Sequence, residues 1–253
     1  MRFSDRTAII TGAASGIGAT YACALVSAGA NVLIADVLES AGEALAQDLT
    51  AQGSGKAAFV RTDVTSERDT AHMVQVALET FGSLDILVNN AAVYADLDKK
   101  KRFDEISSAE WDKVMAVNVK GVWLCAKAVA PHMEQRGYGK IINIASVVSD
   151  LGSAGFVHYV ASKAAVAGLT RALARELGGS NITVNAISPG LVSNESSQKI
   201  NNEGYFEDVI KGRSIKRALA PQDLVGALLF LASSESDFIT GQTYVVDGGA
   251  VMH

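Results

Sequence analysis

Short runs rich in valine, isoleucine and leucine recur along this chain, and stretches with the periodicity of amphipathic helices separate them. Such continuous apolar runs are typical of parallel strands that are buried on both faces and joined by right-handed crossover helices. The pattern predicts an α/β fold, a single-domain Rossmann-type doubly wound parallel sheet of about seven strands flanked by helices. The expected strands span residues 7–10, 32–35, 58–61, 86–88, 141–144, 183–187 and 244–246.

Length and composition favour one domain over residues 1–253, because 49% of the residues are hydrophobic and can fill one large core. The net charge is −5 with both signs interspersed, which offers no basic surface to nucleic acid. Cys23 and Cys125 lie in helical patterns without CxxC spacing, so we expect two buried, reduced thiols. The first residues contain no apolar signal segment and no later run of about 18 apolar residues follows, which predicts a cytoplasmic protein without a membrane partner.

Two connections depart from the regular alternation of strand and helix. Residues 94–103 contain Asp96, Asp98 and Lys99, a composition typical of a solvated surface loop. Residues 191–216 follow the sixth expected strand, at the edge of the sheet where doubly wound folds bind ligands. We therefore expect residues 191–216 to form an irregular segment that acts as a substrate lid.

The first expected strand leads directly into a glycine-rich turn, and a helix is expected from Ala19. Glycine lets the backbone turn tightly and approach a phosphate closely, while free N–H groups at a helix N-terminus attract negative charge. The spacing differs from GxGxxG, so a plain structural turn remains an alternative to phosphate binding. The candidate cofactor residues of this turn are Gly12, Ser15, Gly16, Ile17 and Gly18.

Asp36 ends the second expected strand, 20 residues beyond Gly16. There a carboxylate can accept hydrogen bonds from both hydroxyls of an adenosine ribose, whereas the 2′-phosphate of NADP would meet an unfavourable negative charge. Neither Ser15 nor Val37 offers a compensating cation, so the sequence favours NAD as the cofactor. The alternative for Asp36 is a cap or turn residue after the strand.

Polar residues also follow the third and fourth expected strands, at the same edge of the sheet. Asp63 and Val64 are candidate adenine contacts, although Asp63 fits equally well as a capping residue before the next helix. Asn90 is a candidate cofactor neighbour, and the alternative is that its amide only holds the sheet together through hydrogen bonds.

Ser146, Tyr159 and Lys163 are suited to proton chemistry. Ser146 follows the fifth expected strand, and Tyr159 and Lys163 share one face of a helix expected over residues 158–177. A neighbouring ammonium lowers the pKa of a phenol, which would make Tyr159 a usable acid and base. Ser146 could donate a hydrogen bond to a substrate oxygen, and Lys163 could also hold the nicotinamide ribose. The structural alternatives are a turn serine, a core aromatic residue and a surface amine.

Together with the glycine turn, Ser146 and the Tyr159-x-x-x-Lys163 spacing resemble the short-chain dehydrogenases/reductases. Further matching motifs cover essentially the whole chain: Asn90, Asn118 in Met115-Ala116-Val117-Asn118-Val119, Pro189-Gly190, and Val246-Asp247-Gly248-Gly249. The resemblance implies a mechanism without metal, in which Asn118 holds a water molecule of a proton relay beside the three residues above. It also implies a homotetramer built on two long helices and the C-terminal strand.

The match has two departures. Ala92 stands where the family has a glycine. This implies a backbone conformation that alanine can also adopt, so the change should cost little. Asn194 stands where the family often has a threonine that contacts the nicotinamide carboxamide, so Val192 and Asn194 are candidate cofactor contacts. The run over residues 239–243 and the short tail ending in His253 are similar to the branch that includes 1-phenylethanol dehydrogenase and pyridoxal 4-dehydrogenase.

Apolar and aromatic residues gather in the segments expected to face the substrate, where charged residues are scarce. This pattern predicts an oxidoreductase that acts on a neutral, hydrophobic secondary alcohol or ketone with an aromatic or cyclic frame. Two alternatives are a 3-ketoacyl carrier protein reductase and an NAD-binding regulator without turnover. Asp36 and the net charge speak against the first, and the complete tetrad speaks against the second. The candidate substrate residues, for which ordinary core packing is the alternative, are Tyr94, Val148, Phe156, Tyr205 and Phe206.

Overall fold

The computed structural model describes residues 3–94, 97 and 100–252, so Asp96, Asp98, Lys99 and His253 lie outside the described residues. Seven parallel strands form one sheet in the order β3-β2-β1-β4-β5-β6-β7, which confirms the predicted fold class. The strands are β1 (Thr7–Thr11), β2 (Asn31–Asp36), β3 (Ala57–Arg61), β4 (Ile86–Asn89), β5 (Gly139–Ile144), β6 (Ile182–Pro189) and β7 (Thr243–Val246).

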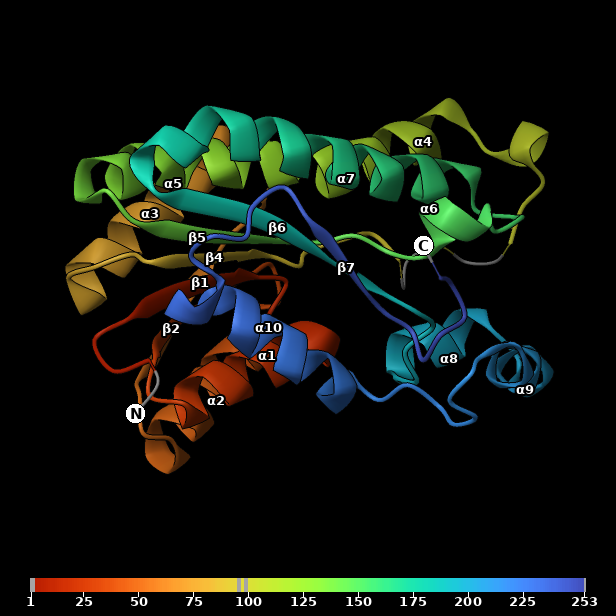
Figure 1. The fold of residues 1–253 in the computed structure, drawn as a ribbon, viewed down its shortest axis with the longest axis horizontal. Coiled ribbons are helices and arrows are strands. Elements are labelled where there is room, and N and C mark those ends of the chain that lie inside the picture. Colours follow the sequence, from red (N-terminus) through yellow and green to blue (C-terminus); the bar gives the residue numbers. More distant parts are fainter. Residues whose placement is uncertain (1–2, 95–96, 98–99, 253) are drawn as a thin grey trace.

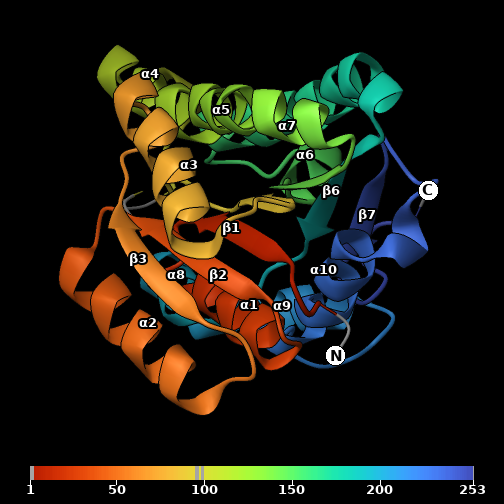
Figure 2. The same ribbon diagram turned by 90° about the vertical axis from the view of Figure 1, so that its left-hand side faces the viewer.

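Helices cover both faces of the sheet, so the molecule has three layers (Figure 1, Figure 2). Helices α1, α2 and α10 lie on one face, and α3, α4, α5 and α7 lie on the other. The helices are α1 (Gly16–Ser27), α2 (Glu39–Gln52), α3 (Glu67–Phe81), α4 (Ser108–Met115), α5 (Gly121–Arg136), α6 (Val148–Leu151), α7 (Val157–Leu177), α8 (Glu195–Ile200), α9 (Glu203–Gly212) and α10 (Val225–Ala232). A π-helical turn (Ala116–Lys120) joins α4 to α5, and short 3₁₀ turns span Phe103–Glu105, Gly178–Ser180, Pro221–Leu224 and Ser234–Ser236.

Each face of the sheet has its own apolar core, and β1 contributes to both. Ile10 packs with Leu25 and Leu228 in the core under α1 and α10, whereas its neighbour Ile9 packs with Cys125 in the core under α3, α5 and α7. Each fully buried aliphatic side chain stabilises the fold by about 1.5–3 kcal/mol. Because both faces of β1 are buried, its residues form a continuous apolar run and do not alternate with polar residues.

The carboxyl ends of the strands create the crevice in which doubly wound folds bind ligands. The strand order reverses at β1, which pairs with β2 on one side and with β4 on the other. Helices α6, α8 and α9 lie at this end of the sheet (Figure 1). The topology therefore brings the segments after β1, β2, β4, β5 and β6 to one place.

The start of α1 and the state of Cys23 differ from their predictions. Helix α1 begins at Gly16 rather than Ala19, so Gly16 and Gly18 belong to its first turn. Cys125 is buried, and burial raises the pKa of its thiol to about 12, but Cys23 is exposed on α1. The prediction of a buried Cys23 is wrong because this position of α1 faces away from the sheet.

Residues 191–216, predicted to be irregular, contain the two helices α8 and α9. Asn194 accepts a hydrogen bond from the backbone N–H of Ser197 (2.9 Å), and Asn202 accepts one from that of Tyr205 (2.9 Å). Both asparagines are N-caps, a role that this residue type fills well. Asparagine is also common in loops, which is why the sequence pattern predicts an irregular segment. That prediction is wrong, because Asn194 and Asn202 begin the two helices.

Helices α4 and α5 and the turn between them form a continuous helical run, Ser108–Arg136, which is long and apolar enough to cross a membrane. Polar and charged residues, among them Asn118, Lys120 and Lys127, interrupt it, so it is not the continuous apolar run of about 18 residues that the sequence was expected to lack. Within its most apolar window, 44% is buried inside the fold, as in a core helix. The run also holds the buried amide of Asn118 and the helix-interior Pro131.

Candidate active site

Glycines shape the turn between β1 and α1. Gly12 has a φ of 64°, and a Cβ atom there would lie 2.7 Å from Ala91 Cα. A Cβ atom on Gly18 would lie 2.3 Å from the carbonyl oxygen of Gly12. Ser15 and Gly16 are exposed, and the Ser15 side chain makes no capping hydrogen bond within the described part of the chain. The first N–H groups of α1 can therefore reach an anion.

The carboxylate of Asp36 connects the end of β2 to this turn. Its Oδ2 accepts a hydrogen bond from the backbone N–H of Ala14 (2.9 Å), and its Oδ1 accepts one from that of Leu38 (3.1 Å). Asp36 therefore acts as a turn residue after β2, which is the alternative role that the sequence offered for it. Each carboxylate oxygen still has a lone pair for a further donor, so ribose binding is compatible with these bonds.

Asp63, Val64 and Asn90 lie at the same edge of the sheet. Asp63 Oδ1 accepts hydrogen bonds from the backbone N–H (2.9 Å) and the hydroxyl (2.7 Å) of Thr65 in the turn before α3, whereas the N-cap of that helix is Ser66. Val64 is buried, and Asn90 Nδ2 donates to the carbonyl oxygens of Thr11 and Gly12 (3.0 and 2.9 Å). These bonds hold the turn to β4, and contact of the three residues with a cofactor stays a prediction.

Asn118 lies in the π-helical turn between α4 and α5 and is fully buried. Its Oδ1 accepts a hydrogen bond from the backbone N–H of Val93 (2.7 Å), and its Nδ2 donates to Ser162 Oγ (3.1 Å). The Ser162 hydroxyl in turn donates to the carbonyl oxygen of Tyr159 (2.8 Å). The amide thus ties the segment after β4 to the turn of α7 that carries Tyr159.

Ser146, Tyr159 and Lys163 come together at the carboxyl end of β5. Ser146 and Tyr159 are 9% and 8% exposed, so little water reaches their hydroxyls. Lys163 is 3% exposed, its Nζ donates to the carbonyl oxygen of Ile144 (2.7 Å), and the same Nζ lies 5.6 Å from the centre of the Tyr159 ring. A proton donor, a hydrogen-bonding hydroxyl and a buried amine therefore share one site.

Burial controls the acidity of this group. Burial raises the pKa of Tyr159, the nearby Tyr94 raises it further, and a hydrogen bond with Ser146 opposes the shift. Burial also lowers the pKa of Lys163 to about 8. The predicted downward shift of the Tyr159 pKa is therefore wrong, because loss of hydration outweighs the effect of an amine that is held by the Ile144 carbonyl.

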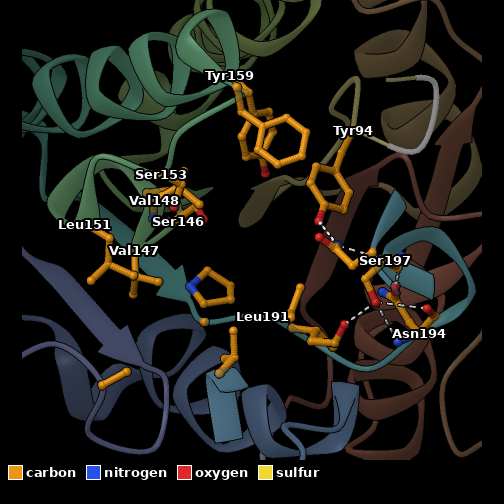
Figure 3. A pocket seen from close by; sticks show the side chains of 18 of the residues that line it. Tyr94, Ser146, Val147, Val148, Leu151, Ser153, Tyr159, Leu191, Asn194 and Ser197 are labelled. Carbon is orange, nitrogen blue, oxygen red and sulfur yellow. Dashed lines mark hydrogen bonds between the residues drawn. The ribbon is translucent and has the colours of Figure 1, made fainter. Parts of the chain in front are cut away.

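A cavity opens beside Tyr159, between α6 and the helices α8 and α9. Figure 3 shows Ser146 and Tyr94 on opposite sides of this cavity, with Tyr159 between them and Leu191 across from Tyr159. The predicted residues that line it are Ile17, Tyr94, Ser146, Val148, Phe156, Tyr159, Val192, Asn194 and Tyr205.

Phe206 does not line the cavity, so its assignment to the substrate site is wrong. Successive helical residues point in directions about 100° apart, and Tyr205 takes the inward direction on α9. Val209, four residues after Tyr205, lies on the same face of α9 and lines the cavity in its place.

Asn201 and Arg213 also line the cavity, and the sequence interpretation missed both. Arg213 is 2% exposed and donates from its two terminal nitrogens to the carbonyl oxygens of Arg217 (3.1 Å) and Leu191 (2.7 Å). Burial lowers the pKa of Arg213, and the charge of Asp247 opposes that shift. The expectation of few charged residues near the substrate therefore needs correction, also because Lys100 Nζ lies 3.4 Å from the ring centre of Tyr205 and 5.7 Å from that of Phe156, which line the cavity. Neither Asn201 nor Arg213 belongs to a local motif that sequence alone could recognise.

Known proteins resemble this chain over nearly its whole length. A family model described as enoyl-(acyl carrier protein) reductase matches residues 12–251. A cis-4-hydroxycyclohexanecarboxylate dehydrogenase of Sinomonas cyclohexanicum is 38% identical over 98% of this chain and 97% of the relative. A crystal structure from Brucella melitensis, described as a short-chain dehydrogenase/reductase of the glucose/ribitol dehydrogenase kind, matches with a TM-score of 0.90 and 30% identity over 100% of this chain and 99% of the other. The chain belongs to the short-chain dehydrogenase/reductase family.

Another relative of this short-chain dehydrogenase/reductase is a 3-oxoacyl-(acyl-carrier-protein) reductase of Thermotoga maritima, 35% identical over 100% of both chains. The match confirms the family that the motifs predict, and the chain is an oxidoreductase of that family. Members use a nicotinamide dinucleotide, NAD or NADP.

The residues present fit such a cofactor. Gly12 lets the turn pack closely against Ala91, the exposed Ser15 and Gly16 leave the start of α1 open to a phosphate, and Asp36 ends β2 with lone pairs to spare. These features suit a pyrophosphate followed by a ribose with two hydroxyl groups.

Proposed function

We propose that this protein is an NAD-dependent oxidoreductase that interconverts a neutral secondary alcohol and the corresponding ketone. The observation that supports this most directly is the meeting of Ser146, Tyr159 and Lys163 beside one apolar cavity. A bound nicotinamide supplies the hydride for ketone reduction and accepts it in alcohol oxidation.

The side chains of the site orient the substrate, transfer the proton and bind the cofactor ribose. Ser146 Oγ donates a hydrogen bond to the substrate oxygen and orients it. The Tyr159 hydroxyl gives its proton to that oxygen during reduction and takes a proton from it during oxidation. Lys163, with a pKa of about 8, is mainly a cation at neutral pH; it binds ribose hydroxyls and stabilises the negative charge that develops on Tyr159 when the phenol gives up its proton. Asn118 positions α7 and holds the water of a proton relay.

The position of Asp36 supports NAD over NADP. Its carboxylate ends β2 and is held by two backbone N–H groups, so it cannot easily move away from a ribose 2′-phosphate. Arg61, its partner in the β2–β3 register, extends toward Asp69, with 3.9 Å between the charged atoms. We assign the remaining cofactor contacts to the other predicted residues, which are Gly12, Ser15, Gly16, Ile17, Gly18, Asp63, Val64, Asn90, Val192 and Asn194.

The lining of the cavity supports a neutral, largely apolar substrate. Val148, Leu151 and Phe156 cover one side, and the helices α8 and α9 form the lid on the other. The two terminal nitrogens of Arg213 donate to backbone carbonyls, and the nearby charge of Asp247 partly offsets that of the guanidinium, which leaves only Arg213 Nε without a partner among the described residues. The relatives give two substrate classes to test against this proposal, a cyclic hydroxy acid and an acyl thioester.

Two surface features support the predicted homotetramer. Strand β7 is an edge of the sheet, and sheet edges are usually covered. Trp111 and Trp123 are exposed on α4 and α5. A second copy of the chain would cover both surfaces, and we propose a cytoplasmic assembly of this kind.

A substrate panel tests the proposed function. NADH formation is followed with neutral cyclic and aryl secondary alcohols, polyols and cis-4-hydroxycyclohexanecarboxylate, and NADH or NADPH consumption is followed with ketones and a 3-oxoacyl thioester. We expect neutral ring alcohols and ketones to give the highest kcat/KM with NAD(H). Turnover restricted to the thioester with NADPH would identify a 3-ketoacyl carrier protein reductase instead, and no turnover of any member would favour a regulator.

A further inference from the structure

Asn201 lines the cavity and carries a hydrogen-bond acceptor that has no partner within the described part of the chain. It follows the last turn of α8, is 7% exposed and lines the cavity. Its Nδ2 donates to the carbonyl oxygen of Ser197 (3.1 Å) and to the hydroxyl oxygen of Tyr94 (3.2 Å). Its Oδ1 is buried and has no hydrogen-bond partner among the residues that the structure describes. Buried acceptors without a partner are rare and costly.

The contact with Ser197 fixes which way the Asn201 amide points. A backbone carbonyl can only accept a hydrogen bond, so the nitrogen and not the oxygen of the amide must face Ser197. Turning the amide over would place two acceptors against each other. The unpaired atom of Asn201 is therefore its oxygen.

Tyr94 supplies a donor beside this acceptor. Its hydroxyl oxygen accepts from Asn201, which leaves its own proton available for another group. The Tyr94 ring lies 5.1 Å from the Tyr159 ring, centre to centre, and Figure 3 shows Tyr94 on the side of the cavity opposite Ser146. A donor and an acceptor thus lie together, beside Tyr159 and across the cavity from Ser146.

We propose that Tyr94 and Asn201 bind a second hydroxyl group of the substrate. Asn201 Oδ1 accepts the proton of that hydroxyl, and the Tyr94 hydroxyl donates to its oxygen. This inference rests on the proposed function and narrows it, because the substrate becomes a diol or hydroxyketone on a ring frame rather than a simple alcohol.

The pairing of one donor with one acceptor discriminates among substituents. A carboxylate would use the Tyr94 proton but would meet the Asn201 oxygen without a proton to offer it. An ammonium would satisfy the oxygen but would leave the Tyr94 proton without an acceptor. A hydroxyl uses both groups, and an analogue that lacks it leaves both without a partner.

The test compares cyclohexanol with the cis and trans cyclohexanediols, and with cis-4-hydroxycyclohexanecarboxylate as the anionic probe. Wild-type protein is measured beside Asn201→Leu, which has a similar size without polar atoms, and Tyr94→Phe, which keeps the ring. Asn202→Ala is the matched control, since Asn202 is an exposed neighbour that caps α9 and does not line the cavity. Kinetics with NAD and calorimetric binding of each compound are recorded for all four proteins.

For wild type we expect kcat/KM to be about 10- to 100-fold higher for at least one diol than for cyclohexanol. Asn201→Leu and Tyr94→Phe should each remove most of this preference through the KM of the diol, so that kcat/KM falls more for the diol than for cyclohexanol. Asn202→Ala should change both compounds by the same factor. A purely structural role of Asn201 would likewise change both equally, so equal losses in Asn201→Leu and Tyr94→Phe overturn the proposal.

Absence of any diol preference in wild type, or a preference for the carboxylate, also overturns it. Calorimetry separates this inference from the proposed function. Diol binding that depends on Asn201, without turnover of any alcohol, would support the second-hydroxyl site and contradict the alcohol dehydrogenase. Turnover of cyclohexanol without a diol preference would support the alcohol dehydrogenase and contradict the second-hydroxyl site.

Discussion

Tyr159 carries the proton chemistry proposed here, and its environment differs from the one that its sequence spacing suggests. The i, i+4 relation to Lys163 places both residues on one face of α7, but the Lys163 amine is bound to the Ile144 carbonyl. Burial then becomes the dominant influence, raising the pKa of Tyr159 and lowering that of Lys163. Tyr159 is thus protonated at neutral pH, ready to act as an acid toward a ketone.

This state of Tyr159 predicts opposite pH dependences for the two directions of the reaction. Because its folded pKa is raised, the phenolate needed for oxidation is scarce at neutral pH, so kcat/KM for alcohol oxidation should rise about tenfold per pH unit between about pH 6 and 7, where Lys163, with a pKa of about 8, stays a cation. Ketone reduction should stay nearly flat over the same range. Initial rates in both directions, with the melting temperature recorded at each pH, check this, and oxidation that is fastest at acidic pH would contradict it.

Asp36 gives a second prediction for a single residue. Replacing Asp36 with Ala removes the carboxylate that repels a 2′-phosphate and accepts from ribose hydroxyls, so the ratio of kcat/KM for NAD to that for NADP should fall about 10- to 100-fold. The variant also loses the bonds to Ala14 and Leu38. Asp36→Asn is therefore the companion variant, because its amide oxygen retains one of them. An unchanged ratio in both variants would rule out the assigned role.

At the scale of elements, sequence patterns predicted the strands and the long helices but not the short ones. The strands could be found because burial on both faces leaves an apolar run, whereas their order in the sheet was not predicted and comes from the structure. Helices α8 and α9 depend on the caps of Asn194 and Asn202, and these residues fit a loop equally well. The sequence also did not place Asn201 against Tyr94, because the two residues are 107 positions apart and no local pattern links them.

The π-helical turn between α4 and α5 gives a prediction for an element. Asn118→Ala leaves the buried N–H of Val93 without its 2.7 Å acceptor, which should lower the free energy of unfolding by about 1–3 kcal/mol. Ser162→Ala, which leaves the Val93 bond in place, should cost less. Urea unfolding of both variants measures the difference, and equal losses would show that the Val93 bond is not what Asn118 contributes.

At the scale of the whole molecule, β7 is one of the two edges of the sheet, and both tryptophans are exposed. Strand β7 has a single neighbour, β6, and Trp111 and Trp123 are 38% and 43% exposed. The sequence predicted the single-domain sheet, since that depends on patterns within the chain. It carries no local signal for a surface that pairs with another copy, and the homotetramer rests on the family resemblance.

Light scattering on the purified protein should therefore give the mass of four chains. Trp123→Glu places a charge on the exposed face of α5 and should shift that mass downward while the fold, followed by circular dichroism, is kept. A monodisperse monomer for the wild-type protein would contradict the assembly.

The most direct test of the central claim is the turnover of Tyr159→Phe with a neutral ring alcohol and NAD, measured together with NADH binding by fluorescence. The variant removes one hydroxyl and keeps the ring that packs on Tyr94. We predict that turnover falls at least about 100-fold while the affinity for NADH stays within about twofold. Turnover close to that of the wild type, with NADH still bound, would contradict the role of Tyr159 as the acid and base of this enzyme.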